Sequence, residues 1–353
     1  MSHETKTPSR VYIDVTNACP LQCLHCCTAS GERRADELSL VEIISLVDQV
    51  QGMQVKNLVL TGGEPLARAD LPAILRHACR QGMNVTLLTN GILLDRSWAK
   101  LLAELGVRVK ISLDGVSAET HNFLRGNGAF EMATQALERL RAAGAENLAV
   151  HFTVHRQNCR EIARLPELLS ELGIHNLVVG LIKPSGRAKD NPALLIPPAM
   201  AAYVRQKIEA LTHCEQITLQ QLSDKGWGSD TEDLFGCPAT CNKLGVGATG
   251  ETTTCTFLGQ EFMGKNVREY PLAELWQQHL AGGKCFVANA ECAECPNLPF
   301  SGGGCRARAL YYRQDINAPD PYCCASFAKK RFLDQHRPLL EQALAGPELA
   351  FQD

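Results

Sequence analysis

Short apolar runs alternate with helical patterns through the first half of this 353-residue chain, and this alternation restricts the fold more than any other feature. Apolar runs predict strands over 11–16, 57–62, 84–90, 108–114, 147–155 and 176–183. Apolar residues at helical spacing predict helices over 39–52, 70–81, 95–105, 129–143 and 160–172. Such alternation is typical of parallel sheets with right-handed crossovers. We therefore expect an α/β fold, a partial (β/α)6 barrel of the TIM type.

Three cysteines directly follow the first apolar run, Val11 to Val15. Cys19, Cys23 and Cys26 have the spacing C-x3-C-x2-C. Three thiolates on one loop can hold three irons of a cubane iron–sulfur cluster, which normally has four cysteine ligands. The remaining iron would be open to a ligand that is not protein, as the open position of a catalytic zinc site is. A zinc site or buried free thiols are the alternatives, but no clean second cysteine pair lies nearby.

Polar, glycine-rich motifs end the next three predicted strands. They are Thr61-Gly-Gly-Glu-Pro65, Thr89-Asn-Gly91 and Ser112-Leu-Asp-Gly115. Each alone would mark only a turn, but barrel active sites lie at the carboxyl ends of strands. With the cysteine triad, and in this order, the motifs resemble the radical S-adenosylmethionine (SAM) family over about residues 10–190. The resemblance implies a 4Fe–4S cluster whose open iron chelates SAM, cleavage of SAM to a 5′-deoxyadenosyl radical, and abstraction of a hydrogen atom from the substrate.

The resemblance also assigns residues to SAM. Glycine lets a backbone approach a ligand closely, so Gly62 and Gly63, with the Glu64 carboxylate, are expected to bind the amino end of SAM. Ser112 and Asp114 are expected to hold ribose or methionine groups. The other candidates are Asn90, His25 near adenine (or an exposed loop histidine), Arg125 near the SAM carboxylate, and Asn158 after the fifth strand.

A second cysteine-rich region begins at Phe235, with nine cysteines between Cys237 and Cys324. It resembles the SPASM domain, which carries auxiliary iron–sulfur clusters in some radical SAM enzymes. The resemblance implies a first cluster on Cys237, Cys241, Cys255 and Cys305, with a short hairpin at Gly250-x4-Cys255. It implies a second cluster on Cys292, Cys295 and either Cys323 or Cys324.

The second cluster lacks one expected ligand, because Ser301 stands where the family has a cysteine five residues after Cys295. Ser301 itself, a carboxylate, Cys285 or the spare member of the Cys323–Cys324 pair could replace it. The cluster could instead have an open iron or be absent. Considered alone, the region fits one or two zinc sites in a ribbon-like knuckle equally well; the N-terminal motifs favour clusters.

Two histidines are candidates for acid–base catalysis. His151 and His155 alternate with Thr153 on one face of the fifth predicted strand. That face could point into the barrel, where a histidine could relay a proton, although a hydrogen-bonded structural role is the alternative for each. Lys183 and Arg187 follow the sixth strand and could bind carboxylates of SAM or substrate, or be solvated loop charges.

Composition limits the other possibilities. The net charge of −3 disfavours a general nucleic-acid surface, and no apolar stretch reaches the roughly 20 residues of a membrane span. The first ten residues lack a signal-peptide core, so sixteen cysteines indicate metal ligands in a cytoplasmic, reducing environment. We expect the barrel in 1–190, a linker with a helix near 199–212 in 191–234, the SPASM domain in 235–326, and a C-terminal helix or tail in 327–353.

We therefore predict a radical SAM oxidoreductase that crosslinks or oxidises a ribosomally made peptide, as part of the SPASM branch does. The barrel begins by about residue 10, so a separate protein could recognise a leader peptide, and a flavodoxin or ferredoxin is the implied electron donor. Thr256, where sulfatase maturases have an aspartate, disfavours that activity. The alternatives are a small-molecule enzyme (a tetrapyrrole or cofactor-biosynthesis enzyme, or an aminoglycoside or sugar dehydrogenase or epimerase) and a non-enzymatic metal scaffold.

Overall fold

A computed structural model describes residues 7–220, 243–259, 262–281, 290–293 and 304–323. Its centre is a nine-stranded sheet in the order β7-β6-β5-β4-β3-β2-β1-β8-β9. The strands are β1 (Arg10–Asp14), β2 (Asn57–Thr61), β3 (Asn84–Thr89), β4 (Arg108–Ser112), β5 (Leu148–Val154), β6 (Asn176–Leu181), β7 (Thr218–Gln220), β8 (Lys243–Val246) and β9 (Thr252–Thr253). The expected tail in 327–353 lies outside the described residues.

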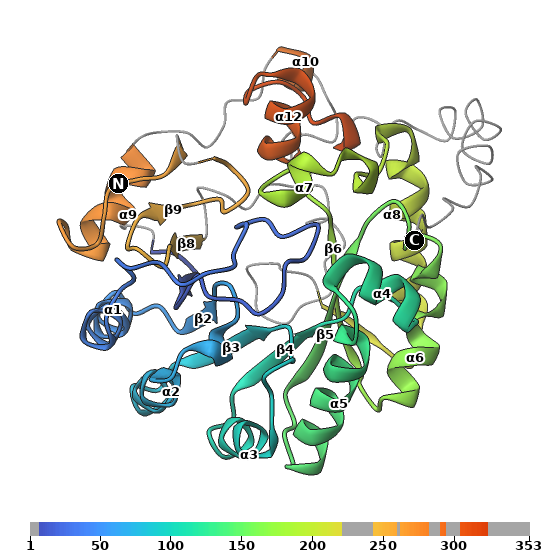
Figure 1. Cartoon of the computed structure of the whole chain (residues 1–353). Coiled ribbons are helices and arrows are strands. Elements are labelled where there is room, and N and C mark those ends of the chain that lie inside the picture. Colours follow the sequence, from blue (N-terminus) through green and yellow to red (C-terminus); the bar gives the residue numbers. More distant parts are fainter. Residues whose placement is uncertain (1–6, 221–242, 260–261, 282–289, 294–303, 324–353) are drawn as a thin grey trace.

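Strands β1 to β6 match the six predicted strands to within two residues at each end. Each pairs in parallel with the next one in the chain, and the sheet curves into a partial barrel (Figure 1). The predicted parallel barrel is therefore confirmed. The sequence did not predict β7, which pairs with β6, or β8, which pairs in parallel with β1. Through β8, a C-terminal segment extends the sheet at the edge of its first strand.

Helices surround the outer side of the sheet (Figure 1). Four of them match the prediction to within one residue: α1 (Leu40–Gly52), α2 (Leu71–Arg80), α3 (Arg96–Glu104) and α5 (Ala129–Ala142). The predicted helix over 160–172 begins as the 3-10 turn η2 (Glu161–Arg164) and continues as α6 (Leu165–Glu171), because Pro166 fits only the first turn of an α-helix.

Helix α4 (Ala118–Arg125) was not predicted, because it is short and buries only His121 and Leu124. The predicted helix over 199–212 is α8 (Ala201–Ala210), flanked by two short 3-10 turns. The remaining helices are α7 (Arg187–Asp190), α9 (Leu272–Ala281), α10 (Ala290–Ala293) and α12 (Arg306–Arg313). Within the described ranges, no helix has both the length and the apolar character that a membrane crossing requires.

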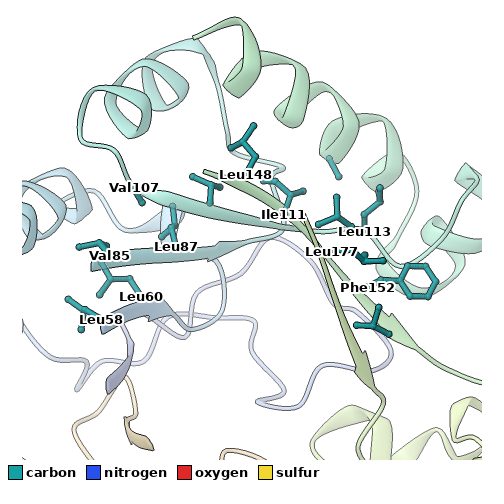
Figure 2. Close-up of a cluster of buried hydrophobic side chains, with 14 of the residues drawn as sticks. Leu58, Leu60, Val85, Leu87, Val107, Ile111, Leu113, Leu148, Phe152 and Leu177 are labelled. Atoms are coloured by element: carbon teal, nitrogen blue, oxygen red, sulfur yellow. The ribbon is translucent and has the colours of Figure 1, made fainter. Parts of the chain in front are cut away.

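Alternate strand residues form the core between sheet and helices. Leu58 and Leu60 of β2 and Val85 and Leu87 of β3 are buried there (Figure 2). Since successive side chains of a strand point to opposite faces, the residues between them face the inside of the barrel. The carboxyl ends of β1 to β6 therefore bring the sequence motifs to one edge.

Candidate functional site

Cys19, Cys23 and Cys26 lie on the loop that joins β1 to α1. The Cys19 N–H donates to the Gly31 carbonyl over 2.8 Å, and the Cys26 N–H donates to the Cys23 carbonyl over 3.2 Å. Each of the three sulfurs has one polar side-chain neighbour. The pairs are Asn90 Nδ2 and Cys19 Sγ at 3.7 Å, Arg125 Nη1 and Cys23 Sγ at 3.9 Å, and Thr28 Oγ1 and Cys26 Sγ at 3.5 Å.

These neighbours suit thiolates, because donors and cations stabilise the charged form of a thiol. Burial nevertheless raises the pKa of Cys19 to about 11 and also raises the pKa of Cys23. For Cys26, burial is outweighed by hydrogen bonds from Thr28 and Ser30, so its pKa is lowered. A bound metal would remove the protons outright.

The arrangement fits a cluster better than a zinc ion. Among the described residues, no three Cys, His, Asp or Glu side chains converge on a point where one metal ion could sit. Zinc requires its sulfurs about 2.3 Å from a single ion, but a cubane cluster takes each thiolate on a different iron. The described cysteines are all free of disulfides.

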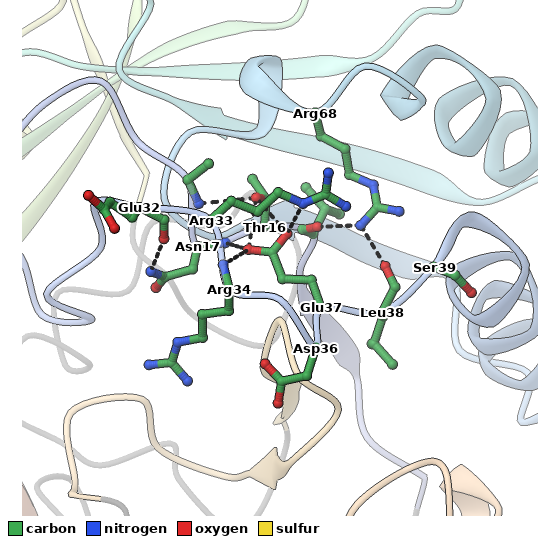
Figure 3. Close-up of polar contacts among 12 residues, drawn as sticks. Thr16, Asn17, Glu32, Arg33, Arg34, Asp36, Glu37, Leu38, Ser39 and Arg68 are labelled. Atoms are coloured by element: carbon green, nitrogen blue, oxygen red, sulfur yellow. Dashed lines mark hydrogen bonds and ion pairs between the residues drawn. The ribbon is translucent and has the colours of Figure 1, made fainter.

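The Glu37 carboxylate accepts hydrogen bonds from both ends of the cysteine loop (Figure 3). It is buried, and it accepts from the Thr16 hydroxyl at 2.9 Å and the Asn17 N–H at 2.7 Å, and from the Arg34 N–H at 3.2 Å. Arg68 Nη1 donates to two carbonyls just outside the same ends, those of Val15 at 2.7 Å and Leu38 at 2.8 Å. No sequence motif pointed to Glu37 or Arg68.

Gly62 and Gly63 permit close backbone approach, as expected, but the close neighbour is the cysteine loop. A Cβ on Gly62 would lie 2.3 Å from the Thr16 oxygen, and one on Gly63 would lie 2.5 Å from the Ala18 oxygen. The Gly63 and Glu64 N–H groups donate to these same carbonyls over 2.8 Å. Gly62 and Gly63 thus leave room for the backbone after β2 to hold the cysteine loop through hydrogen bonds. The contact of the two glycines with SAM stays a prediction.

Glu64 is fully buried at the carboxyl edge. Its oxygens accept hydrogen bonds from the Leu66 N–H at 3.0 Å, the Thr89 hydroxyl at 2.7 Å and the Asn90 N–H at 2.8 Å. Burial raises the pKa of Glu64 despite these donors. A carboxylate has about four acceptor positions, so these three bonds leave about one unused, and the contact of Glu64 with the ammonium of SAM stays a prediction.

Asp114 is held by protein groups, and its expected contact with SAM stays a prediction. It is fully buried, and its Oδ2 accepts a hydrogen bond from Arg125 Nε at 2.6 Å and lies 3.3 Å from His25 Nε2. Its Oδ1 accepts from the Thr153 N–H at 2.7 Å. Burial alone would raise its pKa, but Arg125 and His25 hold the pKa well below its usual range. Asp114 therefore positions these two side chains, and only Ser112 keeps exposed surface at the end of β4.

His155 and Asn158 are both fully buried. Asn158 Oδ1 accepts from the His155 N–H at 2.7 Å, and its Nδ2 donates to the carbonyls of Asp114 at 3.0 Å and Thr153 at 2.9 Å. His155 Nδ1 accepts from the Gln157 N–H at 3.4 Å, and burial lowers the pKa of His155 to about 4. Both side chains thus hold the turn after β5, and their expected roles toward SAM and substrate stay predictions.

His151 lies half-buried on the inner face of β5, opposite Ser112 in the sheet register. Burial lowers the pKa of His151 to about 4, so the ring is neutral at pH 7. It faces the inside of the barrel, as the sequence predicted, and its acid–base role stays a prediction.

Arg187 was expected to bind substrate, but it packs on the cysteine loop. Its Nε donates to the Cys23 carbonyl at 2.8 Å and its Nη1 to the Ser30 carbonyl at 2.9 Å. Lys183 lies at the other cysteine region, with Nζ 5.5 Å from the centre of the Phe257 ring. Burial lowers the pKa of Lys183 to about 8.

Known proteins share these features. The family model of the Radical SAM superfamily matches residues 13–180. The AdoMet-dependent heme synthase of Methanosarcina barkeri is 30% identical, over 92% of this chain and 99% of its own length. The chain belongs to the radical SAM superfamily. It is therefore an enzyme of a family that uses a 4Fe–4S cluster and SAM, and the non-enzymatic alternative is excluded.

Two further similarities extend beyond the barrel. This radical SAM enzyme is 28% identical to the PqqA peptide cyclase of Streptomyces rochei, over 98% of this chain and 96% of that protein. The solved structure of anSMEcpe with bound AdoMet and Kp18Cys peptide has a TM-score of 0.74 at 20% identity, covering 96% and 99% of the two chains. That structure shares the fold along nearly the whole length.

The C-terminal region of the radical SAM enzyme brings several cysteines together. Cys255 follows the β8–β9 hairpin, where a hairpin was predicted, and packs with Cys305 in a small buried cluster. A Cβ on Gly304 would lie 2.7 Å from the Cβ of Cys323, so Cys323 is close to Cys305. Cys292 is also buried. Cys237, Cys241, Cys285, Cys295, Ser301 and Cys324 lie outside the described residues.

A buried ion pair that the sequence did not indicate holds Cys305. Asp320 Oδ2 accepts from the Cys305 N–H at 2.7 Å and from Arg308 Nε at 3.0 Å. The Arg308 guanidinium lies 4.5 Å from the centre of the Tyr322 ring, and the Tyr322 hydroxyl donates to the Ile196 carbonyl. Arg308 and Asp320 are fully buried.

A cavity of about 200 Å³ lies between the two cysteine regions. Its lining comes from the cysteine loop (Cys27, Thr28, Ser30), from the segment around Cys255 (Thr253, Thr256, Leu258) and from β1 (Tyr12, Asp14). Asp14 was not a candidate from the sequence. The available signal was a carboxylate inside the otherwise apolar run from Val11 to Val15.

Proposed function

We propose that this radical SAM enzyme oxidatively modifies a ribosomally made peptide, by crosslinking or another oxidation. The observation that carries the proposal is the cavity lined by both cysteine regions. We place the substrate in this cavity, beside the cysteine loop (Cys27, Thr28, Ser30) and the segment around Cys255 (Thr253, Thr256, Leu258). The similarity to the PqqA peptide cyclase supports a peptide substrate.

We assign the SAM-binding cluster to Cys19, Cys23 and Cys26. When bound, the cluster and SAM supply the 5′-deoxyadenosyl radical. Arg125 and Asn90 donate toward the sulfurs of Cys23 and Cys19. The SAM-binding residues are assigned to the surroundings of the loop, namely Gly62, Gly63, Glu64, Ser112 and His25, with the Arg125 guanidinium beside the SAM carboxylate.

We assign residues 235–326 to a SPASM domain with auxiliary clusters. The first would be held by Cys237, Cys241, Cys255 and Cys305, and the second by Cys292, Cys295 and Cys323. The juxtaposition of Cys255 and Cys305 supports the first set. A flavodoxin or ferredoxin as electron donor, and a separate leader-binding protein, complete the proposal.

The test is anaerobic incubation of the reconstituted enzyme with SAM, dithionite and synthetic peptides made from each short open reading frame found beside its gene. We expect 5′-deoxyadenosine and a peptide that has lost two hydrogen atoms, detected by mass spectrometry. Cys305→Ala should retain 5′-deoxyadenosine formation and lose the product. Unchanged product formation by this variant would refute the role of the auxiliary cluster.

A second candidate is oxidative modification of a tetrapyrrole side chain, which the 30% identity to the AdoMet-dependent heme synthase supports. The same assay with an iron porphyrin that carries carboxylate side chains separates the two. A modified porphyrin and an unmodified peptide would favour this candidate.

A further inference from the structure

We propose that Asp14 takes a proton from the substrate as the substrate is oxidised, in the cavity between the two cysteine regions. The inference rests on the proposed function, because it concerns the oxidative step. It adds a catalytic residue that none of the sequence motifs contains.

The position of Asp14 is the first argument. It ends β1 at the carboxyl edge, and β1 alternates so that Val11 and Ile13 are buried against the helices while Tyr12 and Asp14 line the cavity. Its side chain remains partly exposed to that space. A group in this place can touch a substrate that lies between the two cysteine regions.

The second argument is that Asp14 lacks the partners that neighbouring carboxylates have. Glu37, Glu64 and Asp114 each accept several hydrogen bonds from the protein. Among the described residues, no hydrogen bond or ion pair reaches the Asp14 carboxylate, and the Glu251 carboxylate repels it. An acceptor left open toward a cavity is available to a ligand.

Electrostatics support the same role. Burial raises the pKa of Asp14 to about 7, and repulsion from Glu251 adds to the effect. The titratable side chains that line the same cavity are Tyr12, Cys27, Arg34 and Glu251. A general base works best when its pKa lies near the working pH, and an ordinary aspartate is a weaker acceptor.

The competing candidates fit less well. His155 is fully buried, and His151 is not part of the cavity lining. Thr256, which follows Cys255, lines the cavity but has no carboxylate.

The oxidation balances with Asp14 as the proton acceptor. A C–H bond and an X–H bond of the substrate are replaced by a C–X bond, where X is carbon or a heteroatom. One hydrogen atom passes to the 5′-deoxyadenosyl radical and forms 5′-deoxyadenosine. One electron passes to an auxiliary iron–sulfur cluster, and one proton passes to the Asp14 carboxylate.

The decisive comparison is between Asp14→Asn and Glu251→Gln in the reconstituted holoenzyme, with SAM and the peptide that the wild-type enzyme oxidises in the assay above. We expect Asp14→Asn to form 5′-deoxyadenosine and to yield at least about 100-fold less oxidised peptide, as loss of a general base does. Glu251→Gln should shift the acidic limb of the pH profile of product formation to lower pH, whatever its maximal rate, since loss of the repelling carboxylate lowers the pKa of Asp14. Wild-type product formation by Asp14→Asn, or an unshifted pH profile of Glu251→Gln, would overturn the proposal.

A second measurement needs no substrate. Infrared difference spectra of the holoenzyme between pH 6 and 8 should contain a protonated-carboxyl band that Asp14→Asn lacks and that the exposed control Asp36→Asn retains. If the wild type lacks that band, the Asp14 carboxyl is not protonated between pH 6 and 8, and Asp14 is not the general base. If the wild type shows the band but oxidises no peptide, the proposed function is wrong, while the raised pKa of Asp14 is confirmed.

Discussion

Arg125 contacts three groups that the sequence keeps far apart: the carboxylate of Asp114, the sulfur of Cys23 and the ring of His25. A guanidinium has five donors in a rigid fork and stays charged when buried, so one side chain can serve all three. The expected contact between Arg125 and the SAM carboxylate would add to these contacts. The charge of Arg125 therefore acts on the cysteine loop before any ligand binds.

At the same scale, we predict a pH effect on stability from His155. Its pKa is lowered by burial from 6.5 to about 4, so its contribution to stability is present above pH 6.5 and is lost as the pH falls toward 4. By linkage this contribution amounts to roughly 3 kcal/mol. His155→Asn, whose amide oxygen can still accept from the Gln157 N–H, should lose less unfolding free energy between pH 7 and pH 4 than the wild type.

Chemical denaturation at the two pH values measures this difference. The exposed His175→Asn serves as the control and should behave as the wild type. Equal pH dependence of all three proteins would contradict the assignment.

At the scale of elements, the loop between β1 and α1 has a fixed shape because its ends are held. Glu37 and Arg68 bind backbone groups at both ends. Ser39 then starts α1 with a capping box, in which Glu42 accepts from the Ser39 N–H at 2.7 Å. The loop geometry thus depends on polar contacts outside the cysteine motif.

We predict that Glu37→Ala destabilises the fold by about 3 kcal/mol, because it leaves buried donors at Thr16 and Asn17 without an acceptor. It should also lower the iron and sulfide content of the anaerobically reconstituted enzyme. Glu32→Ala is the matched control on the same loop, since only the Glu32 carbonyl is used there. Wild-type iron content in Glu37→Ala would show that the loop does not need this support.

At the scale of the whole molecule, several contacts join the C-terminal region to the barrel, and three of them are of different kinds. β8 pairs with β1, the Tyr322 hydroxyl donates to the Ile196 carbonyl, and Arg268 Nε pairs with Glu42 Oε1 at 2.6 Å. The exposed pair adds little to stability, so sheet pairing and the buried contacts dominate. The cavity exists because the two regions meet in this way.

We predict that Arg308→Met costs about 3–5 kcal/mol, because it leaves the buried Asp320 carboxylate unpaired. The double variant Arg308→Met/Asp320→Leu should recover part of this loss, although the Cys305 N–H then lacks its acceptor. Equilibrium unfolding of the single and double variants measures the coupling. Strictly additive losses would contradict an ion pair of this strength.

The six barrel strands, six of the helices and the place of the motifs at one edge followed from the sequence alone. Apolar periodicity is a local property, and parallel strands must end at a common edge, so neither inference needed distant contacts. The radical SAM motifs were equally local, because each consists of neighbouring residues.

Only the tertiary structure decided which polar residues face the cavity. Asp114, Asn158 and Arg187 follow strand ends as expected, yet each pairs with protein groups, whereas Asp14 inside an apolar run faces open space. Asp14 and Asp114 are the same residue type, and each lies at or just after the carboxyl end of a strand. What differs is whether a partner from another part of the chain satisfies the charge, and only folding brings that partner into contact.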